Sequence, residues 1–179
     1  MKYLRQLSLL ALVVLGMSSC SKDLSPFTKS LYQQNRWSES ELSQIQFYLS
    51  DDIVIRRQLR DASSAIISGE IKMVDGRQIE EVIIPKGTPG VLVDLKDNNR
   101  DFAISFERGR FLMFGPNPKM DGRYVLMASD WRDRRGKVKY DGKTFYTQPG
   151  NGLATLMVDL KKIRKLDVQS RKVRGVKVD

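Results

Sequence analysis

The sequence contains no histidine, and Cys20 is the only cysteine among its 179 residues. Without histidine, the Ser-His-Asp and Cys-His arrangements that activate a nucleophile cannot be built in their common forms. The usual zinc ligands are missing for the same reason, and no second cysteine exists to form a disulfide. An enzyme built from this chain would have to work with carboxylates, Lys, Tyr or Ser. We therefore predict that the chain is not an enzyme and binds no metal or other cofactor.

The apolar run near the start of the chain is too short to span a membrane. It extends from Leu7 to Leu15 and contains one polar residue, Ser8, whereas about 20 residues are needed to cross the hydrocarbon layer. Lys2 and Arg5 precede the run and small residues follow it. This order is typical of a secretory signal peptide, so we expect residues 1–19 to be a leader that takes no part in the fold.

The residues at the end of this leader, Met17-Ser18-Ser19-Cys20, resemble the lipobox of bacterial lipoprotein precursors. That motif usually has Leu three places before the cysteine and small residues at the next two. The resemblance is confined to residues 1–20. It implies that signal peptidase II cleaves before Cys20 and that this residue carries a diacylglycerol and an N-acyl chain. Because about two acyl chains suffice for stable attachment, the mature chain would be held on a membrane.

The residue after the cysteine suggests which membrane this is. In lipoproteins of this kind, Asp directly after the cysteine retains the protein at the inner membrane, and this chain has Ser21 there. The resemblance therefore implies the outer membrane of a Gram-negative envelope. Lys22-Asp23 is similar to the charged tags that send some lipoproteins to the cell surface, so the periplasmic and surface orientations both remain open.

The charge balance predicts an acidic partner. The full chain carries a formal net charge of +10, and removing the leader with Lys2 and Arg5 leaves +8. An excess of Lys and Arg attracts anions, and export removes nucleic acid from the candidates. The partners left in the envelope are an anionic glycan, a lipid headgroup or an acidic protein surface. The apolar share of 41% is enough for a folded core.

One helix is predicted from local signals. Ser38 and Glu41 have the spacing of a capping box, in which each side chain bonds a backbone N–H at the helix start. Trp37 and Leu42 stand where a hydrophobic staple would form across that box. The apolar residues that follow recur with helical spacing, so we expect an amphipathic helix over residues 37–50 that docks on the domain.

The remainder of the chain has the pattern of short strands and turns. Asp75-Gly76 and Asp141-Gly142 each separate two stretches rich in β-branched residues and predict hairpin turns. We expect a mainly β protein made of one or two small SH3-like β-barrels, with a single β-sandwich as the alternative. The predicted organisation is a signal peptide at 1–19, a tether at 20–36, the helix at 37–50, a first β unit at 51–115, a linker at 116–121 and a second β unit at 122–179.

An internal duplication is one interpretation of the two β units. The residues Val-Asp-Leu-Lys occur at 93–96 and again at 158–161, each following an Asp-Gly turn. The alternative is that all-β chains reuse the same turn residues by necessity.

Several motifs that resemble catalytic or metal sites lack essential parts. Residues 142–144 read Gly-Lys-Thr, but strand-forming residues follow where a P-loop needs a helix. Residues 97–101 begin like a calcium loop, but Phe102 occupies the position of its glycine. The adjacent pairs Asp51-Asp52 and Glu80-Glu81 point to opposite faces of extended segments, so neither pair converges on one substrate atom.

The strongest functional candidate is a pair of basic regions, residues 131–143 and the chain end from residue 161. We expect either a docking face for an anionic partner, with aromatic side chains as anchors, or a merely solvated surface. The predicted binding residues are Trp131, Arg132, Arg134, Arg135, Lys137, Lys139, Tyr140, Arg171 and Arg174.

The function predicted from these features is that of a lipid-anchored, non-enzymatic binding or scaffold protein in an envelope assembly. Its partner would be a protein or an anionic envelope polymer. The alternative is an envelope hydrolase that cleaves glycans with two carboxylates, which the sequence leaves open because carboxylate separation depends on the fold.

Overall fold

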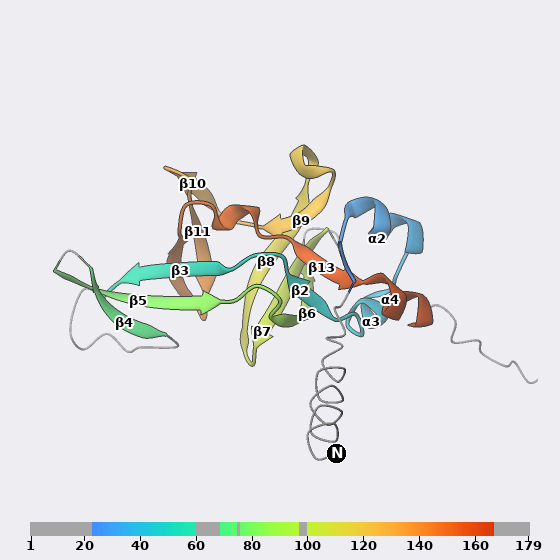
Figure 1. Ribbon diagram of the computed structural model, residues 1–179, viewed down its shortest axis with the longest axis horizontal. Coiled ribbons are helices and arrows are strands. Elements are labelled where there is room, and N and C mark those ends of the chain that lie inside the picture. The colour runs from blue at the N-terminus through green and yellow to red at the C-terminus, as the bar shows by residue number, and fades with distance from the viewer. Residues whose placement is uncertain (1–22, 60–68, 75, 97–99, 167–179) are drawn as a thin grey trace, which may run out of the picture.

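The computed structural model describes residues 23–59, 69–74, 76–96 and 100–166, which form two antiparallel sheets and several short helices (Figure 1). One sheet has seven strands in the order β1 (Leu24–Pro26), β13 (Leu156–Asp159), β2 (Phe47–Leu49), β6 (Pro89–Lys96), β7 (Asp101–Glu107), β8 (Arg110–Asn117) and β9 (Arg123–Leu126). The other has six in the order β10 (Asp130–Arg132), β11 (Arg135–Tyr140), β12 (Lys143–Thr147), β3 (Ile53–Gln58), β5 (Arg77–Ile84) and β4 (Glu70–Val74). The mainly β class is thus confirmed.

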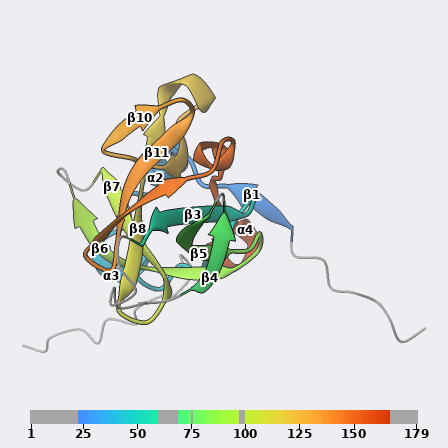
Figure 2. The same cartoon turned by 90° about the vertical axis from the view of Figure 1, so that its left-hand side faces the viewer.

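The helices are short. They are α2 (Lys29–Asn35), α3 (Glu39–Leu42) and α4 (Leu160–Leu166), together with the 3-10 turns η1 (Pro118–Met120) and η2 (Asn151–Leu153). Figure 1 shows α2, α3 and α4 at one end of the described part of the chain and β3, β4 and β5 at the other. Figure 2 shows β10 and β11 on one side of β3, with β4 and β5 on the other, in agreement with the strand order.

Neither sheet closes into a barrel, so the prediction of SH3-like barrels is wrong. The seven-stranded sheet comes near to closure, because the N–H of Tyr124 donates to the carbonyl of Phe27 at 3.0 Å and that of Leu126 donates to the carbonyl of Ala154 at 3.2 Å. These bonds form only isolated bridges. β1 ends after three residues and the chain turns into α2, so no continuous ladder joins the two ends of the sheet.

The predicted boundary at residues 116–121 does not divide the sheets. β2 pairs with β13 and β3 pairs with β12, so each sheet takes strands from both sides of this segment. Residues 116–121 themselves complete β8 and form η1. Buried side chains of both sheets also belong to one hydrophobic cluster, which includes Ile55 and Phe145 from one sheet and Phe102 and Leu156 from the other.

Most of the predicted tether belongs to the folded domain. β1 pairs with β13, and α2 follows with Thr28 as its N-cap. Between them, Phe27 is fully buried, with ring centroids 5.0 Å from Tyr124 and 5.3 Å from Phe47. The sequence pattern of 20–36 is polar, and the single buried phenylalanine that anchors it was not recognised as a signal.

The predicted helix at 37–50 is correct only at its start. The capping box is confirmed, because Glu41 accepts from the N–H of Ser38 at 2.8 Å and Ser38 accepts from the N–H of Glu41 at 3.3 Å. The helix ends at Leu42, and residues 47–49 form β2, which bonds β13 and β6. Pairing with two strands therefore overrides the helical spacing of the apolar residues, although Leu42 and Leu49 are both buried.

The turn predictions hold where the structure describes them. Asp141 and Gly142 have φ values of 48° and 71° and connect β11 to β12, as a two-residue hairpin turn of type I′ requires. Thr144 lies in β12, so the Gly-Lys-Thr segment is a turn and a strand. Gly76, with φ of 72°, lies between β4 and β5.

Candidate functional site

The six-stranded sheet has one apolar face and one polar face. In β11, Val138 and Tyr140 are buried while Arg135 and Lys137 are exposed. β3 follows the same alternation, since its buried Ile55 precedes the half-exposed Arg56. Successive side chains of a strand point to opposite faces. The apolar face covers the core, and the opposite face carries the charged side chains.

A groove of about 760 Å³ lies on this polar face. It receives side chains from all six strands of the sheet. Its basic lining consists of Arg56, Arg57, Arg77, Arg132, Arg135 and Lys137, and its acidic lining consists of Asp130 and Asp133. Cations thus outnumber carboxylates, and the groove attracts anions.

Three of the six cations are held by carboxylates. Arg56 pairs with Glu81, Arg57 pairs with Glu80 at 2.5 Å, and Arg132 pairs with the groove carboxylate Asp130 at 3.0 Å. The two glutamates are both buried, on opposite faces of β5, and each fixes the position of its arginine.

The other three cations of the groove are Arg77, Arg135 and Lys137. They have no ion-pair partner among the residues that the structure describes. Asp130 on β10 stands opposite Lys137 but pairs with Arg132 instead. The three cations therefore remain available to an anion from outside.

An exposed aromatic side chain lies in the middle of the groove. Tyr146 of β12 is 47% exposed, and it stands directly opposite Lys137 on β11 and Arg56 on β3. Glu81 on β5 continues this row opposite Arg56. Directly opposed side chains of neighbouring strands lie within contact distance. The row therefore places a ring between two cations, which suits a ligand with both an apolar surface and a negative charge.

The predicted binding residues do not form one surface. Arg132, Arg135 and Lys137 line the groove. Arg134 lies at the exposed turn between β10 and β11, and Lys139 is exposed on β11 beside the groove.

The other predicted binding residues lie elsewhere. Trp131 and Tyr140 are on the opposite face of the sheet and line other pockets. Arg171 and Arg174 lie outside the described residues, as does Cys20. Their predicted roles stay predictions.

Most groove residues outside β10 and β11 were not predicted from the sequence. Arg56, Arg77 and Tyr146 join the groove only because β3 pairs with both β12 and β5. Residues 56 and 146 are far apart in the chain, and no local pattern predicts their pairing. The alternation within residues 135–140 could have indicated that Tyr140 points away from Lys137.

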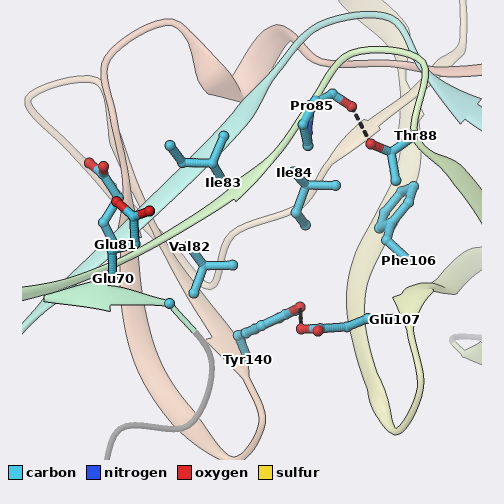
Figure 3. Close-up of a pocket in the computed structure, with 11 residues that line it drawn as sticks. Glu70, Glu81, Val82, Ile83, Ile84, Pro85, Thr88, Phe106, Glu107 and Tyr140 are labelled. Atoms are coloured by element: carbon cyan, nitrogen blue, oxygen red, sulfur yellow. Dashed lines mark hydrogen bonds between the residues drawn. The ribbon is translucent and has the colours of Figure 1, made fainter.

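A second pocket, of about 360 Å³, lies beside the buried end of Tyr140 (Figure 3). The phenol O–H of Tyr140 donates to Glu107, whose carboxylate also pairs with Arg110 at 3.2 Å. Burial, and then this hydrogen bond, raise the pKa of Tyr140. The phenol therefore stays protonated at neutral pH and acts as a fixed donor.

Carboxylates line both sides of this second pocket. Figure 3 shows Glu70 and Glu81 on one side and Glu107 with Tyr140 on the other. The hydrogen bond from Lys72, followed by that from Arg56, lowers the pKa of Glu81. This carboxylate is therefore ionised at neutral pH, whereas a general acid for glycoside cleavage needs a raised pKa.

No three acidic side chains come together as a metal site within the part of the chain that the structure describes. Asp97 and Asn99 of the calcium-like segment lie outside that part. None of the helices in the described ranges is both long and apolar enough to cross a membrane.

Comparisons with protein-family models, with curated proteins and with solved structures found no match to this chain.

Proposed function

We propose that this chain is a lipid-anchored envelope protein that acts as a non-enzymatic binding or scaffold subunit and docks an anionic partner in the groove of its six-stranded sheet. One observation carries the proposal. Arg77, Arg135 and Lys137 line the groove around the exposed ring of Tyr146, and they have no carboxylate partner among the described residues.

The arrangement of charges supports recognition of an extended anion. The row of Lys137, Tyr146 and Arg56 crosses three neighbouring strands, so it offers repeated contacts along one direction. Exposed cations of this kind speed the encounter with an anion and make binding dependent on salt. Tyr146 adds a contact that salt does not weaken, because an aromatic side chain buries apolar surface on binding.

The lipid anchor would hold β1 close to a membrane, whereas the groove lies on the other sheet. In the proposal, Cys20 carries the acyl chains, and only residues 21–23 separate it from β1. A three-residue spacer reaches at most roughly 10 Å. The partner would therefore be a component of the envelope that a domain held at the membrane can reach.

The groove is tested with a soluble chain of residues 21–179. Its binding to peptidoglycan sacculi, to lipopolysaccharide vesicles and to an acidic peptide is measured by co-sedimentation or anisotropy over a range of salt concentrations. We expect at least one of these probes to bind with steep salt dependence. The double substitution Arg77→Glu with Lys137→Glu should weaken that binding about tenfold or more.

The matched control is Lys86→Glu with Lys119→Glu. These two lysines are exposed and lie outside the groove, so the control makes the same change in net charge. Equal weakening of binding by both double variants would mean that only the net charge of the protein matters. That result would refute the groove as the binding site. Salt-independent binding of every probe, or no binding at all, would also contradict the proposal.

The anchor is tested separately in cells. We expect the native protein to fractionate with the outer membrane and to begin at an acylated Cys20 in mass spectrometry. Cys20→Ser should release the protein from the membrane fraction, since none of the acyl chains could then be attached. A native chain that still begins at Met1 and lacks acyl groups would refute the lipoprotein assignment without affecting the groove.

A further inference from the structure

We infer that a second site, the pocket beside Trp131, binds a pyranose ring of a glycan. It lies on the opposite face of β10 from the groove. In β10, Asp130 and Arg132 line the groove, whereas Trp131 between them lines a pocket of about 560 Å³. The two sites therefore share a strand but no side chain, and the inference does not depend on the proposed function of the groove.

Trp131 combines exposure with a fixed position. Its side chain is 46% exposed, yet the end of its indole is packed against two glycines. A Cβ atom at Gly152 would lie 2.2 Å from the ring, and one at Gly136 would lie 2.9 Å from it. No side chain fits at either position while the indole stays in place. A ring that is already held costs little conformational entropy when a ligand stacks on it.

The rest of the pocket provides both apolar and polar groups. Pro116, Met127 and Ala128 line it beside the indole. Lys29 lines it from α2, and its ammonium group has no ion-pair partner among the described residues. Asn117 also lines it, and its Oδ1 accepts from the N–H of Lys119 at 2.9 Å, which leaves its amide N–H groups as donors.

Asp101 supplies the acceptor of the pocket. It is only 8% exposed, and its carboxylate contacts Arg100 at 3.4 Å. A carboxylate has about four lone-pair sites, so one arginine contact leaves capacity for ligand hydroxyl groups. Gly115 faces this carboxylate, since a Cβ at Gly115 would lie 2.9 Å from its Oδ1.

This combination matches a pyranose ring. One face of such a ring presents C–H groups that pack on an indole, and its edge presents hydroxyl groups that need both donors and acceptors. The pocket offers a fixed indole, a cation, an amide and a carboxylate in one cavity, and its volume falls in the range of small-molecule sites, roughly 300–1,000 Å³. A purely apolar cargo would leave these polar groups unpaired, which is costly.

The experiment uses neutral oligosaccharides so that the basic groove contributes nothing. Soluble oligomers of glucose and of N-acetylglucosamine are titrated into the ¹⁵N-labelled 21–179 chain. Trp37 is 6% exposed and Trp131 is 46% exposed, so their two indole N–H signals report on different environments. We expect a saturable shift of the Trp131 signal with at least one oligosaccharide and little change in the Trp37 signal.

Three variants show which residues bind the oligosaccharide. Trp131→Ala should abolish binding, and Gly152→Ala should weaken it about tenfold by displacing the indole. The groove variant Arg77→Glu with Lys137→Glu should bind the oligosaccharide unchanged, which separates this site from the groove. Unfolding midpoints of all variants show whether the fold is intact. The titration of the unmodified chain tests the site even if a variant fails to fold.

Failure is equally distinct. If no oligosaccharide shifts the Trp131 signal, the pyranose site is refuted. If Trp131→Ala binds the sugar as well as the unmodified chain does, the sugar binds elsewhere and the inference is wrong.

Discussion

Arg57 and Glu80 form an ion pair beneath the six-stranded sheet, with Nε and Oε2 2.5 Å apart and the glutamate side chain fully buried. The guanidinium group also lies 5.6 Å from the centre of the Phe145 ring. On the opposite face of the sheet, Arg56 of β3 and Lys72 of β4 both donate to Glu81 of β5. The adjacent glutamates are therefore neutralised on separate faces, and the arginines of the groove are anchored by the folded core.

The first prediction concerns this buried pair. Glu80→Leu should lower the free energy of unfolding by about 3–5 kcal/mol, because it leaves the charge of Arg57 without its buried partner. Adding Arg57→Met should recover most of that loss, since an apolar pair can replace a buried ion pair. Glu70→Leu, at a side chain that is 82% exposed, is the control and should change little. Urea unfolding measures all four chains, and a Glu80→Leu variant as stable as the unmodified chain would contradict the structure.

The second prediction concerns the stability of the fold at low pH. The hydrogen bonds from Lys72 and Arg56 lower the pKa of Glu81 below its usual 4.5. A depressed pKa in the folded state means that the unfolded chain binds a proton first as the pH falls. The stability supplied by Glu81 is therefore complete above about pH 4.5 and is lost as the pH falls through its folded pKa.

The substitution Glu81→Gln tests whether the stability supplied by Glu81 is lost as the pH falls. The variant should be less stable than the unmodified chain at about pH 7, and the difference should shrink as the pH falls below about 4.5, because the unfolded chain then binds a proton at this position. Chemical denaturation at a series of pH values gives the two curves. Glu70→Gln should follow the unmodified chain throughout, and a difference that grows towards low pH would refute the assignment.

Local patterns predicted the local structure. The capping box of Ser38 and Glu41 and the hairpin turn at Asp141-Gly142 both depend on residues that are neighbours in the chain. The opposite orientation of Glu80 and Glu81 follows from the alternation of any strand. These features need no knowledge of the remaining fold.

The features that depend on distant pairing were not predicted. Residues 47–49 continue a helical spacing, but they form a strand because they pair with β13 and β6. The groove unites Lys137 with Arg56 because β12 pairs with β3, and no spacing within the chain encodes that register. The basic cluster at 131–143 contains Arg132, Arg135 and Lys137, which line one side of the groove, and it contains no residue of the other side.

The third prediction concerns the phenol of Tyr140. Tyr140→Phe should cost about 1.5–3 kcal/mol, because it removes the hydroxyl that donates to the Glu107 carboxylate, and hydrogen bonds to charged groups fall in this range. Tyr146→Phe is the matched control. Its ring is exposed, so the same loss of a hydroxyl should leave the unfolding midpoint almost unchanged. Equal effects of the two substitutions would show that the bond to Glu107 contributes nothing.

The fourth prediction concerns the turn between β10 and β11, where Asp133 and Arg134 have φ values of 48° and 63°. Two residues with positive φ match the twist of a tight hairpin, but Arg134 adopts this conformation at a cost of about 1–2 kcal/mol. Glycine adopts this conformation without that cost. Its greater flexibility in the unfolded chain offsets part of the gain, so Arg134→Gly should stabilise the protein by up to about 1 kcal/mol. Arg132→Gly, which removes the same charge from within a strand, should destabilise it by about 0.5–1 kcal/mol. Thermal unfolding of the two variants checks the opposite signs. Destabilisation by both would mean that the side chain of Arg134 contributes more than its backbone conformation costs.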